Sequence, residues 1–92
     1  MKSLISNNRE CLICGTTFNL HKHHIFYGTG KRGLSEKYGC WCYLCAIHHN
    51  LSNAGVHFNK EFDNELKQMT QKKFQEHFKD LDFLKIFGRN YL

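Results

Sequence analysis

The hydrophobic positions in the second half of the chain follow a helical period. Phe62, Leu66 and Met69 recur at i, i+4 and i+7, and Phe74 and Phe78 repeat the i, i+4 spacing. Residues at these spacings lie on one face of a helix, so the pattern predicts helices that pack an apolar stripe against a core. The alternative is that this aromatic stripe is an exposed face for a partner.

Polar residues mark where these helices should begin. Asn59 and Thr70 are suited to be the N-caps of two successive helices. A third, short helix is expected to begin near Asp80 and to end at Gly88, a residue type typical of the position after a helix. The residues of this helix expected to point inward are Leu81, Leu84, Ile86 and Phe87.

The first half has a different pattern. An apolar run ending in Tyr43 and Leu44 predicts a strand, and residues 46–53 can form a helix directly after it. Residues 28–39 read GTGKRGLSEKYG, which predicts a flexible basic loop in which Lys31 and Arg32 follow a phosphate backbone. The alternative for this stretch is a solvated hairpin loop without a ligand.

Composition divides the chain into a chemical half and a helical half. Residues 10–57 contain all five cysteines and six of the seven histidines, and residues 58–92 form the helical extension. We find no internal repeat, low-complexity segment or proline, so we expect one domain over residues 1–92. A chain of 92 residues buries a small core, and a metal ion would help to stabilise it.

The cysteine count and the net charge indicate the cellular compartment and the kind of partner. No secretory signal pattern and no apolar run of the roughly 20 residues needed to span a bilayer is found, so a cytoplasmic protein without a membrane partner is expected. In that compartment a Cys-x-x-Cys pair favours metal over a disulfide. The formal net charge of +5 favours an anionic partner, nucleic acid first.

Two pairs of possible ligands, each separated by two residues, predict one structural zinc site. CLICG holds Cys11 and Cys14 in a knuckle that directs two thiolates at one tetrahedral ion. Cys45 and His48 have the same spacing at the expected junction of strand and helix, and complete a four-ligand set. The alternative is that Cys45 is a buried apolar thiol and His48 a surface residue. Cys40 or Cys42 could replace a ligand, although their i, i+2 spacing suits core packing better.

The remaining histidines suggest a second site. His23 and His24 project to opposite sides of a strand, so they are expected to have different roles. His49 and Asn53 stack at i and i+4 on the predicted helix, where they can face a common centre. One of the two adjacent histidines could therefore bind a metal shared with His49, while the other activates water.

The order CLIC, HHI, a glycine-rich loop and YLCAIHHN resembles the HNH or ββα-metal endonuclease superfamily. It is most similar to the phage-encoded HNH nucleases of the recombination-enhancement type with a structural zinc. The resemblance spans residues 10–57 and implies an α+β fold. That fold would be a small zinc-stapled ββα-metal core, with the helical extension packed on it.

The resemblance also implies roles for single residues. His24 would be the general base, and His23 and His49 would bind the catalytic divalent ion. Asn53 matches a further ligand position, and His57 matches a downstream histidine that is a ligand or a phosphate contact. His21 is expected to face solvent or DNA. The middle Asn of the H-N-H signature falls near Cys40, where this chain has GCWC, so what orients His24 is open.

The function predicted on this basis is metal-dependent hydrolysis of DNA with low sequence specificity. Imidazole titrates near neutrality and can activate water, while a divalent cation neutralises charge on phosphate. Mg²⁺, Mn²⁺, Ni²⁺ or Zn²⁺ could serve at histidine ligands. The resemblance implies a phage or prophage protein in a bacterial host. A homodimer or a phage or host recombination partner is compatible with it, although no residue argues for either.

The main alternative is a non-catalytic, zinc-stabilised nucleic-acid-binding module. It accounts for the cysteines, the charge and the basic loop, but leaves the pair His23 and His24 with His49 unexplained. A metal-storage or metal-sensing protein would use the same clusters, but it has no use for the basic loop.

Overall fold

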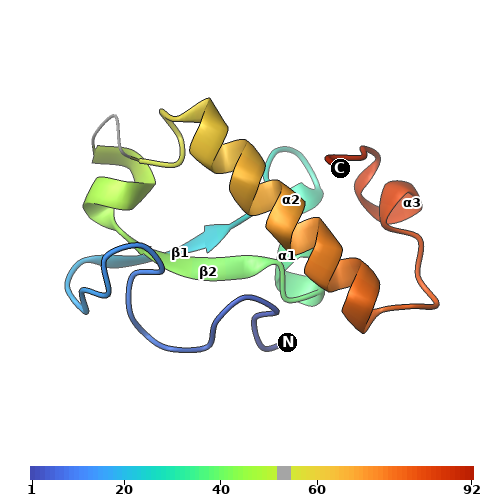
Figure 1. Cartoon of the computed structure of the whole chain (residues 1–92), viewed down its shortest axis with the longest axis horizontal. Helices are drawn as coiled ribbons and strands as arrows, with labels where there is room; N and C mark the ends of the chain where they lie inside the picture. The colour runs from blue at the N-terminus through green and yellow to red at the C-terminus, as the bar shows by residue number, and fades with distance from the viewer. Residues whose placement is uncertain (52–54) are drawn as a thin grey trace.

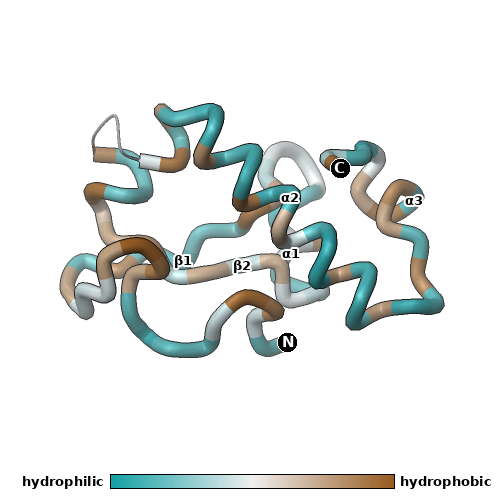
Figure 2. Tube along the Cα trace, in the orientation of Figure 1, coloured by the Kyte–Doolittle hydropathy of each residue, from teal (hydrophilic) through white to brown (hydrophobic). Residues whose placement is uncertain are grey.

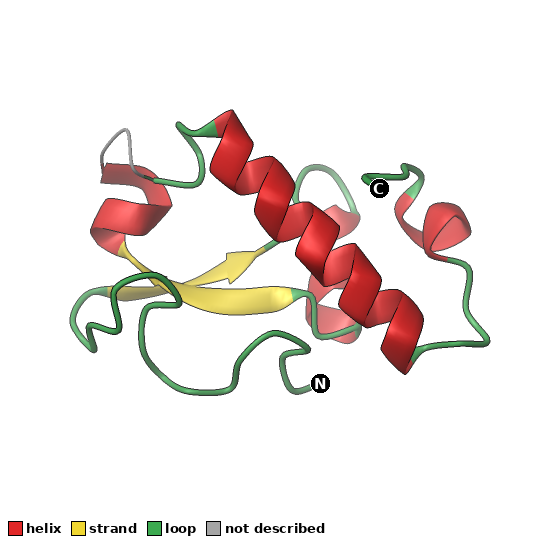
Figure 3. Ribbon diagram, in the orientation of Figure 1, coloured by secondary structure: helices red, strands yellow, loops and turns green. Residues whose placement is uncertain are grey.

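A two-stranded hairpin with a helix in its connection is followed by a π-helical segment, a long helix and a final short helix (Figure 1, Figure 3). The computed structural model describes residues 1–51 and 55–92. The architecture is α+β, as predicted. The elements in chain order are β1 (Leu20–His24), α1 (Lys31–Lys37), β2 (Trp41–Cys45), η1 (Ile47–Leu51), α2 (Lys60–His77) and α3 (Phe83–Phe87). None of the helices in these described ranges has the length and apolarity to cross a bilayer.

The hairpin fixes the register of the histidine-rich strand. β1 and β2 pair antiparallel, from Leu20 opposite Cys45 to His24 opposite Trp41. Side chains alternate along a strand, so His21 and His23 share one face of β1, and Lys22 and His24 share the other. His23 is buried and His24 is half-buried. The adjacent histidines therefore have different surroundings, as the sequence predicts.

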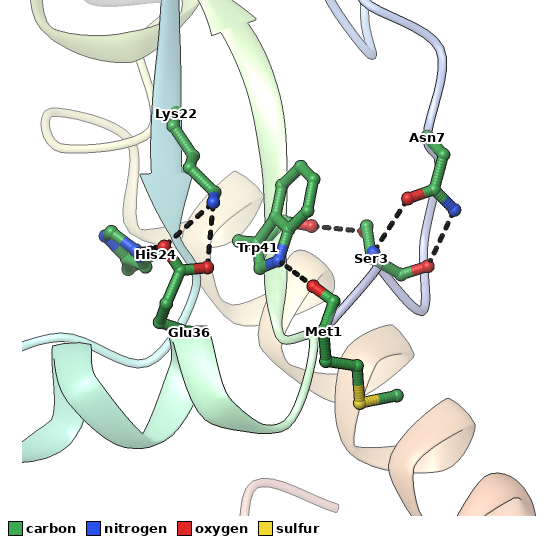
Figure 4. Close-up of polar contacts among 7 residues, drawn as sticks. All are labelled: Met1, Ser3, Asn7, Lys22, His24, Glu36 and Trp41. Carbon is green, nitrogen blue, oxygen red and sulfur yellow. Dashed lines mark hydrogen bonds and ion pairs between the residues drawn. The ribbon is translucent and has the colours of Figure 1, made fainter.

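The N-terminal segment lies along β2 on the side away from β1 (Figure 1). The Leu12 amide donates to the Tyr43 carbonyl at 3.0 Å. Further along, the Trp41 indole donates to the Met1 carbonyl at 3.2 Å, and the Ser3 hydroxyl donates to the Trp41 carbonyl (Figure 4). The bonds to the Tyr43 and Trp41 carbonyls satisfy part of the outer edge of β2, which would otherwise be an open strand edge.

Residues 31–37 are a helix, so the prediction of a flexible loop over 28–39 is wrong there. The reason is a long-range anchor: Ser35 is fully buried. Its hydroxyl donates to the Phe26 carbonyl at 2.6 Å and accepts from the Phe26 amide at 3.1 Å. The Ser35 carbonyl also accepts from the Cys40 amide at 2.8 Å. These contacts tie the connection to both ends of the hairpin, which glycine content alone did not indicate.

α2 is one continuous helix, not the two predicted. Asn59 is its N-cap, with Oδ1 accepting from the Phe62 amide at 3.1 Å. Thr70 does not begin a second helix, because its hydroxyl is buried and donates to the Leu66 carbonyl at 2.7 Å. A threonine bonded in this way sits within a helix instead of capping one. Hydrophilic residues occupy most of α2 in Figure 2.

α3 begins after the N-cap Asp82 and ends at Gly88, which has a left-handed backbone with φ 77°. The end is as predicted, but the inward face is partly wrong. Leu84 is 53% exposed and Leu81 is 40% exposed, whereas Phe83 and Phe87 are buried. The i, i+4 pair of phenylalanines defines the packed face, because it buries more apolar surface than the leucines would.

An aromatic core joins the hairpin to the helical extension. Phe26, which follows β1, lies with its ring centroid 5.1 Å from that of Phe83 and 4.7 Å from that of Phe87. Phe74 of α2 is also fully buried and lies 5.3 Å from Phe83 by the same measure. Met69, predicted on the same stripe, is instead 37% exposed. The core therefore depends on aromatic residues from the hairpin, α2 and α3 together.

Truncation of Phe74 should test this core. Phe74→Ala is expected to lower the free energy of unfolding by about 3–5 kcal/mol, because it removes a fully buried ring and leaves a cavity. Leu84→Ala, a truncation of an exposed apolar residue in α3, should stay within about 0.5 kcal/mol. Urea unfolding followed by circular dichroism measures both. An equal loss for the two variants would contradict the assigned face of α3.

Candidate metal centres

The first cluster joins the N-terminal knuckle to the end of the hairpin. Cys11 and Cys14 lie in a turn closed by a bond from the Gly15 amide to the Cys11 carbonyl at 2.9 Å. Cys45 is the last residue of β2, and His48 lies on η1. The bond between Leu12 and Tyr43 holds the knuckle against β2, so the four predicted ligands meet.

The spacing of these four side chains suits a tetrahedral ion. Their ligand atoms all lie within 4.8 Å of one another. The sulfurs of Cys14 and Cys45 are 3.8 Å apart, and two thiolates bound at about 2.3 Å to one tetrahedral ion lie about 3.8 Å apart. His48 Nδ1 is 3.2 Å from the Cys45 sulfur and 3.7 Å from that of Cys11. The predicted set therefore can hold a metal ion.

The pKa values of the thiols differ within the candidate ligand set as well as between it and the core. A backbone hydrogen bond at Thr16 acts to lower the pKa of Cys14, but loss of solvation and the neighbouring thiols of Cys11 and Cys45 outweigh it and raise this pKa. Burial acts to raise the pKa of Cys11, but hydrogen bonds from the backbone at Cys14, Cys45 and Ile13 outweigh it and bring this pKa down to about 6.

Burial raises the pKa of Cys40 and of Cys42 to about 12. Thiolates bind metals and protonated thiols do not. Cys40 and Cys42 are buried in the core and, unlike Cys45, are not among the four residues whose ligand atoms meet, so the geometry favours Cys45 as the ligand.

The second cluster consists of His23, His49 and His57. Their ligand nitrogens also lie within 4.8 Å of one another, and Nε2 of His49 is 3.1 Å from Nε2 of His57. His23 comes from β1 and His49 from η1. The Val56 amide donates to the His48 carbonyl at 2.8 Å and the His57 amide to the His49 carbonyl at 3.2 Å. These bonds return the chain to η1 and bring His57 to the cluster.

Asn53, the other predicted ligand, lies outside the described residues, and its place relative to the cluster stays a prediction.

Burial keeps two of these histidines neutral. It lowers the pKa of His23 to about 3, with His49 and His57 adding to the effect. It also lowers the pKa of His49 to about 4, and neighbouring His57, His21 and Arg32 contribute. Nε2 of His23 is buried without a hydrogen-bond partner in the described part of the chain. A neutral imidazole with a buried, unpaired nitrogen fits a metal ligand, since such a nitrogen is otherwise unfavourable.

His21 is less exposed to solvent than predicted, and whether it faces DNA stays a prediction. It is half-buried, and its Nδ1 lies 2.8 Å from Nδ1 of His49. The two-residue period of the strand puts His21 on the same face as His23, and the hairpin register brings that face to η1. The i, i+2 spacing of the two histidines was the signal in the sequence that could have indicated this.

His24 lies on the opposite face of β1, beside α1 (Figure 4). Its Nε2 is buried without a hydrogen-bond partner among the described residues and lies at ion-pair distance, 3.7 Å, from Oε1 of Glu36. The ammonium group of Lys22 donates to both Glu36 oxygens at 2.8 Å, and this bond is the main reason why the pKa of Glu36 is lowered. Sequence reasoning missed Glu36, because it lies in the stretch that was predicted to be a loop.

A cavity of about 140 Å³ connects these groups. The four histidines His23, His24, His49 and His57 line it together with Arg32 of α1. Lys22 and Tyr27 complete the lining. The fold thus brings Arg32 to the histidines as a basic residue at the same cavity, whereas Lys31 is not part of the lining.

Comparison with family models, with curated proteins and with solved structures finds no match to this chain. The function is therefore inferred from the residues and their arrangement. Two features define the site: a four-ligand cluster rich in thiols, and a histidine cluster at a cavity with a basic side chain.

The first cluster makes a direct prediction about metal content. Wild-type protein should retain one equivalent of metal through gel filtration, and Cys14→Ser should lose it, because three remaining ligands do not close the site. Cys40→Ala should keep the metal, since Cys40 lies in the core. Elemental analysis by mass spectrometry measures both variants. Equal metal content in the two would contradict the assigned ligand set.

Proposed function

We propose that the protein is a metal-dependent endonuclease of the HNH type that hydrolyses phosphodiester bonds in DNA with low sequence specificity. The observation that carries this proposal is the cavity in which His23, His49 and His57 meet beside His24 and Arg32. Three of these histidines have metal-ligand spacing, while His24 lies at the same cavity outside that set. In hydrolysis of a phosphodiester, a base such as His24 can activate the water, and a metal ion can neutralise the charge on the phosphate.

The three clustered histidines would hold a divalent cation. When bound, such an ion supplies positive charge to a phosphate oxygen and to the leaving oxygen. His23 and His49 are neutral at pH 7, so their lone pairs are free. Nδ1 of His49 faces Nδ1 of His21. A hydrogen bond from Nδ1–H of His49 to Nδ1 of His21 would leave Nε2 of His49 for the ion. Outer partners of this kind orient ligating histidines.

His24 would act as the general base, and it accepts a proton from the attacking water. Glu36 lies where it can stabilise the protonated imidazole, at 3.7 Å from Nε2. Lys22 holds that carboxylate through two bonds. We infer that Glu36 takes over the orienting task of the middle Asn of the H-N-H signature, which this chain lacks near Cys40. Arg32 adds positive charge at the cavity, where it would attract the scissile phosphate.

The cluster of Cys11, Cys14, Cys45 and His48 would hold a structural zinc. Three thiolates and one imidazole are a common donor set for zinc, and four protein ligands leave no position for water or substrate. This site supports the fold and takes no part in the reaction. The catalytic ion at the histidines would be Mg²⁺, Mn²⁺ or another divalent cation of this kind.

The order of elements supports the resemblance to the HNH or ββα-metal superfamily. His24 ends the first strand of a hairpin, and a short helix with His49 follows the second. By the same resemblance, the protein would be encoded by a phage or prophage and act on DNA in the bacterial cytoplasm. A homodimer, or a recombination partner from phage or host, would be compatible with that role.

The base assignment predicts the result of a cleavage assay. In Mg²⁺ or Mn²⁺, wild-type protein should nick supercoiled plasmid or cut circular single-stranded DNA, and His24→Ala should be slower by about 10²–10⁴-fold, as is typical for loss of a general base. His77→Ala replaces a histidine near the end of α2 and should cut like wild type. If neither wild type nor His77→Ala cuts while both bind DNA, the protein is a zinc-stabilised binding module instead.

The ligand assignment predicts which variants lose the second ion. Isothermal titration of zinc-loaded protein with Mn²⁺ should show one site, and His57→Ala or His49→Ala should weaken it by at least about tenfold, since even outer partners of a ligand contribute 10–100-fold. His77→Ala is again the control and should bind as wild type does. Unchanged Mn²⁺ affinity in both ligand variants would show that the histidine cluster does not hold the ion.

A further inference from the structure

A second, larger cleft lies next to the histidine cavity. Its volume is about 420 Å³, and it shares Tyr27 and His57 with the first cavity. Its other walls come from the first turns of α2 and from the C-terminal segment after α3. This volume falls in the range of small-ligand pockets, about 300–1,000 Å³. The proposed roles of the metal ligands and of the general base do not involve this cleft.

The charge of the cleft suits an anion. Lys60, Lys67 and Arg89 line it together with one carboxylate, Asp63, so three positive charges and one negative charge leave a net +2. Lys67 is paired with Asp63 at 2.8 Å. Within the described residues, no carboxylate lies at ion-pair distance from Lys60 or Arg89. These two exposed cations are therefore free to bind phosphate.

Two tyrosines supply aromatic surface in the same cleft. Tyr27 and Tyr91 are both half-buried. Lys67 Nζ lies 4.3 Å from the ring centroid of Tyr27, and Arg89 Cζ lies 5.1 Å from that of Tyr91. Aromatic rings beside basic side chains are the usual means by which proteins bind single strands, because the rings stack on bases and the cations hold phosphates.

The C-terminal wall of the cleft is held in place by α2. The Tyr91 amide donates to the Gln71 side chain at 2.8 Å, and the Gln68 side chain donates to the Tyr91 carbonyl at 3.0 Å. The Tyr91 ring also lies 5.2 Å from that of Phe26 in the core. Tyr91 is therefore fixed in its position before any ligand binds, which lowers the entropy lost on binding.

We propose that this cleft binds one nucleotide of the substrate strand, next to the phosphodiester that is cleaved at the histidine cavity. Lys60 and Arg89 hold a phosphate of this nucleotide, and the tyrosines contact its base. This inference rests on the proposed nuclease function. A base inside a duplex is stacked and paired, so the cleft takes an unpaired nucleotide. The preferred substrate is then single-stranded or branched DNA.

Binding of a short fluorescein-labelled single-stranded oligonucleotide tests the cleft. Anisotropy is measured in the His24→Ala background, with zinc bound and no other divalent cation, so that no cleavage occurs. The double variant Lys60→Ala, Arg89→Ala should bind at least about tenfold more weakly and reduce the salt slope by about 1. The control Lys72→Ala, Lys73→Ala removes the same charge from exposed positions of α2 outside the cleft. An equal loss in both double variants would overturn the proposal.

Changes in the oligonucleotide test the contact between the tyrosines and the base. The same oligonucleotide is prepared with one abasic position, moved along the strand, and compared with its duplex. One abasic position should weaken binding by about tenfold, in line with the measured value of stacking one base. The duplex should bind more weakly than the single strand. Equal binding of all abasic strands and of the duplex would overturn the nucleotide pocket.

These outcomes are separate from those of the cleavage assay. Loss of binding in the cleft variant, without cleavage by wild type, would keep the cleft and reject the nuclease. Cleavage by wild type together with unchanged binding in the cleft variant would keep the nuclease and reject the cleft. Wild-type protein that binds no oligonucleotide would overturn both.

Discussion

The peptide bond between His48 and His49 links the two candidate metal centres. His48 belongs to the thiol-rich cluster and His49 to the histidine cluster, and both lie on the short η1. An ion held by His48 and Cys45 would fix the start of η1 against β2, and thereby the position of His49 opposite β1. In a chain this small, metal binding is expected to be part of the folding free energy. The histidine cavity then depends on the first cluster.

The phenylalanine core also positions a residue of the site. Phe26 follows directly after the histidine strand and packs against Phe83 and Phe87 of α3. Because Phe26 and Tyr27 are neighbours in the chain, this packing also places Tyr27 between the histidine cavity and the second cleft. The helical extension is therefore more than a support for the hairpin, since it forms one wall of the space beside the histidines.

The electrostatic character of the site follows from burial. Taking His23 and His49 out of water disfavours their charged forms, and the nearby histidines disfavour them further. The basic residues around them are exposed, among them Arg32, Lys60 and Arg89. The result is a pair of neutral histidines, His23 and His49, beside basic side chains, which suits a cation held next to an anionic strand. This arrangement needs His23 and His49 withdrawn from water and the basic residues at the rim.

Local spacing in the sequence determined several features. The pairs Cys11, Cys14 and Cys45, His48 indicated one four-ligand cluster, and Asn59 and Gly88 marked a helix start and a helix end. These signals depend on the geometry of a single turn, strand or knuckle, so a short stretch of sequence contains them. The different surroundings of His23 and His24 also follow from the period of one strand.

Only the tertiary structure decided the features that depend on distant residues. Ser35 bonded to Phe26 makes residues 31–37 a helix, and this helix brings Glu36 to His24. The backbone bonds from Val56 and His57 to η1 complete the histidine cluster, and the hairpin register brings His21 to His49. Thr70 continues α2 because its buried hydroxyl bonds within the helix. In each case the physical reason is burial or pairing with residues far along the chain, which local spacing does not encode.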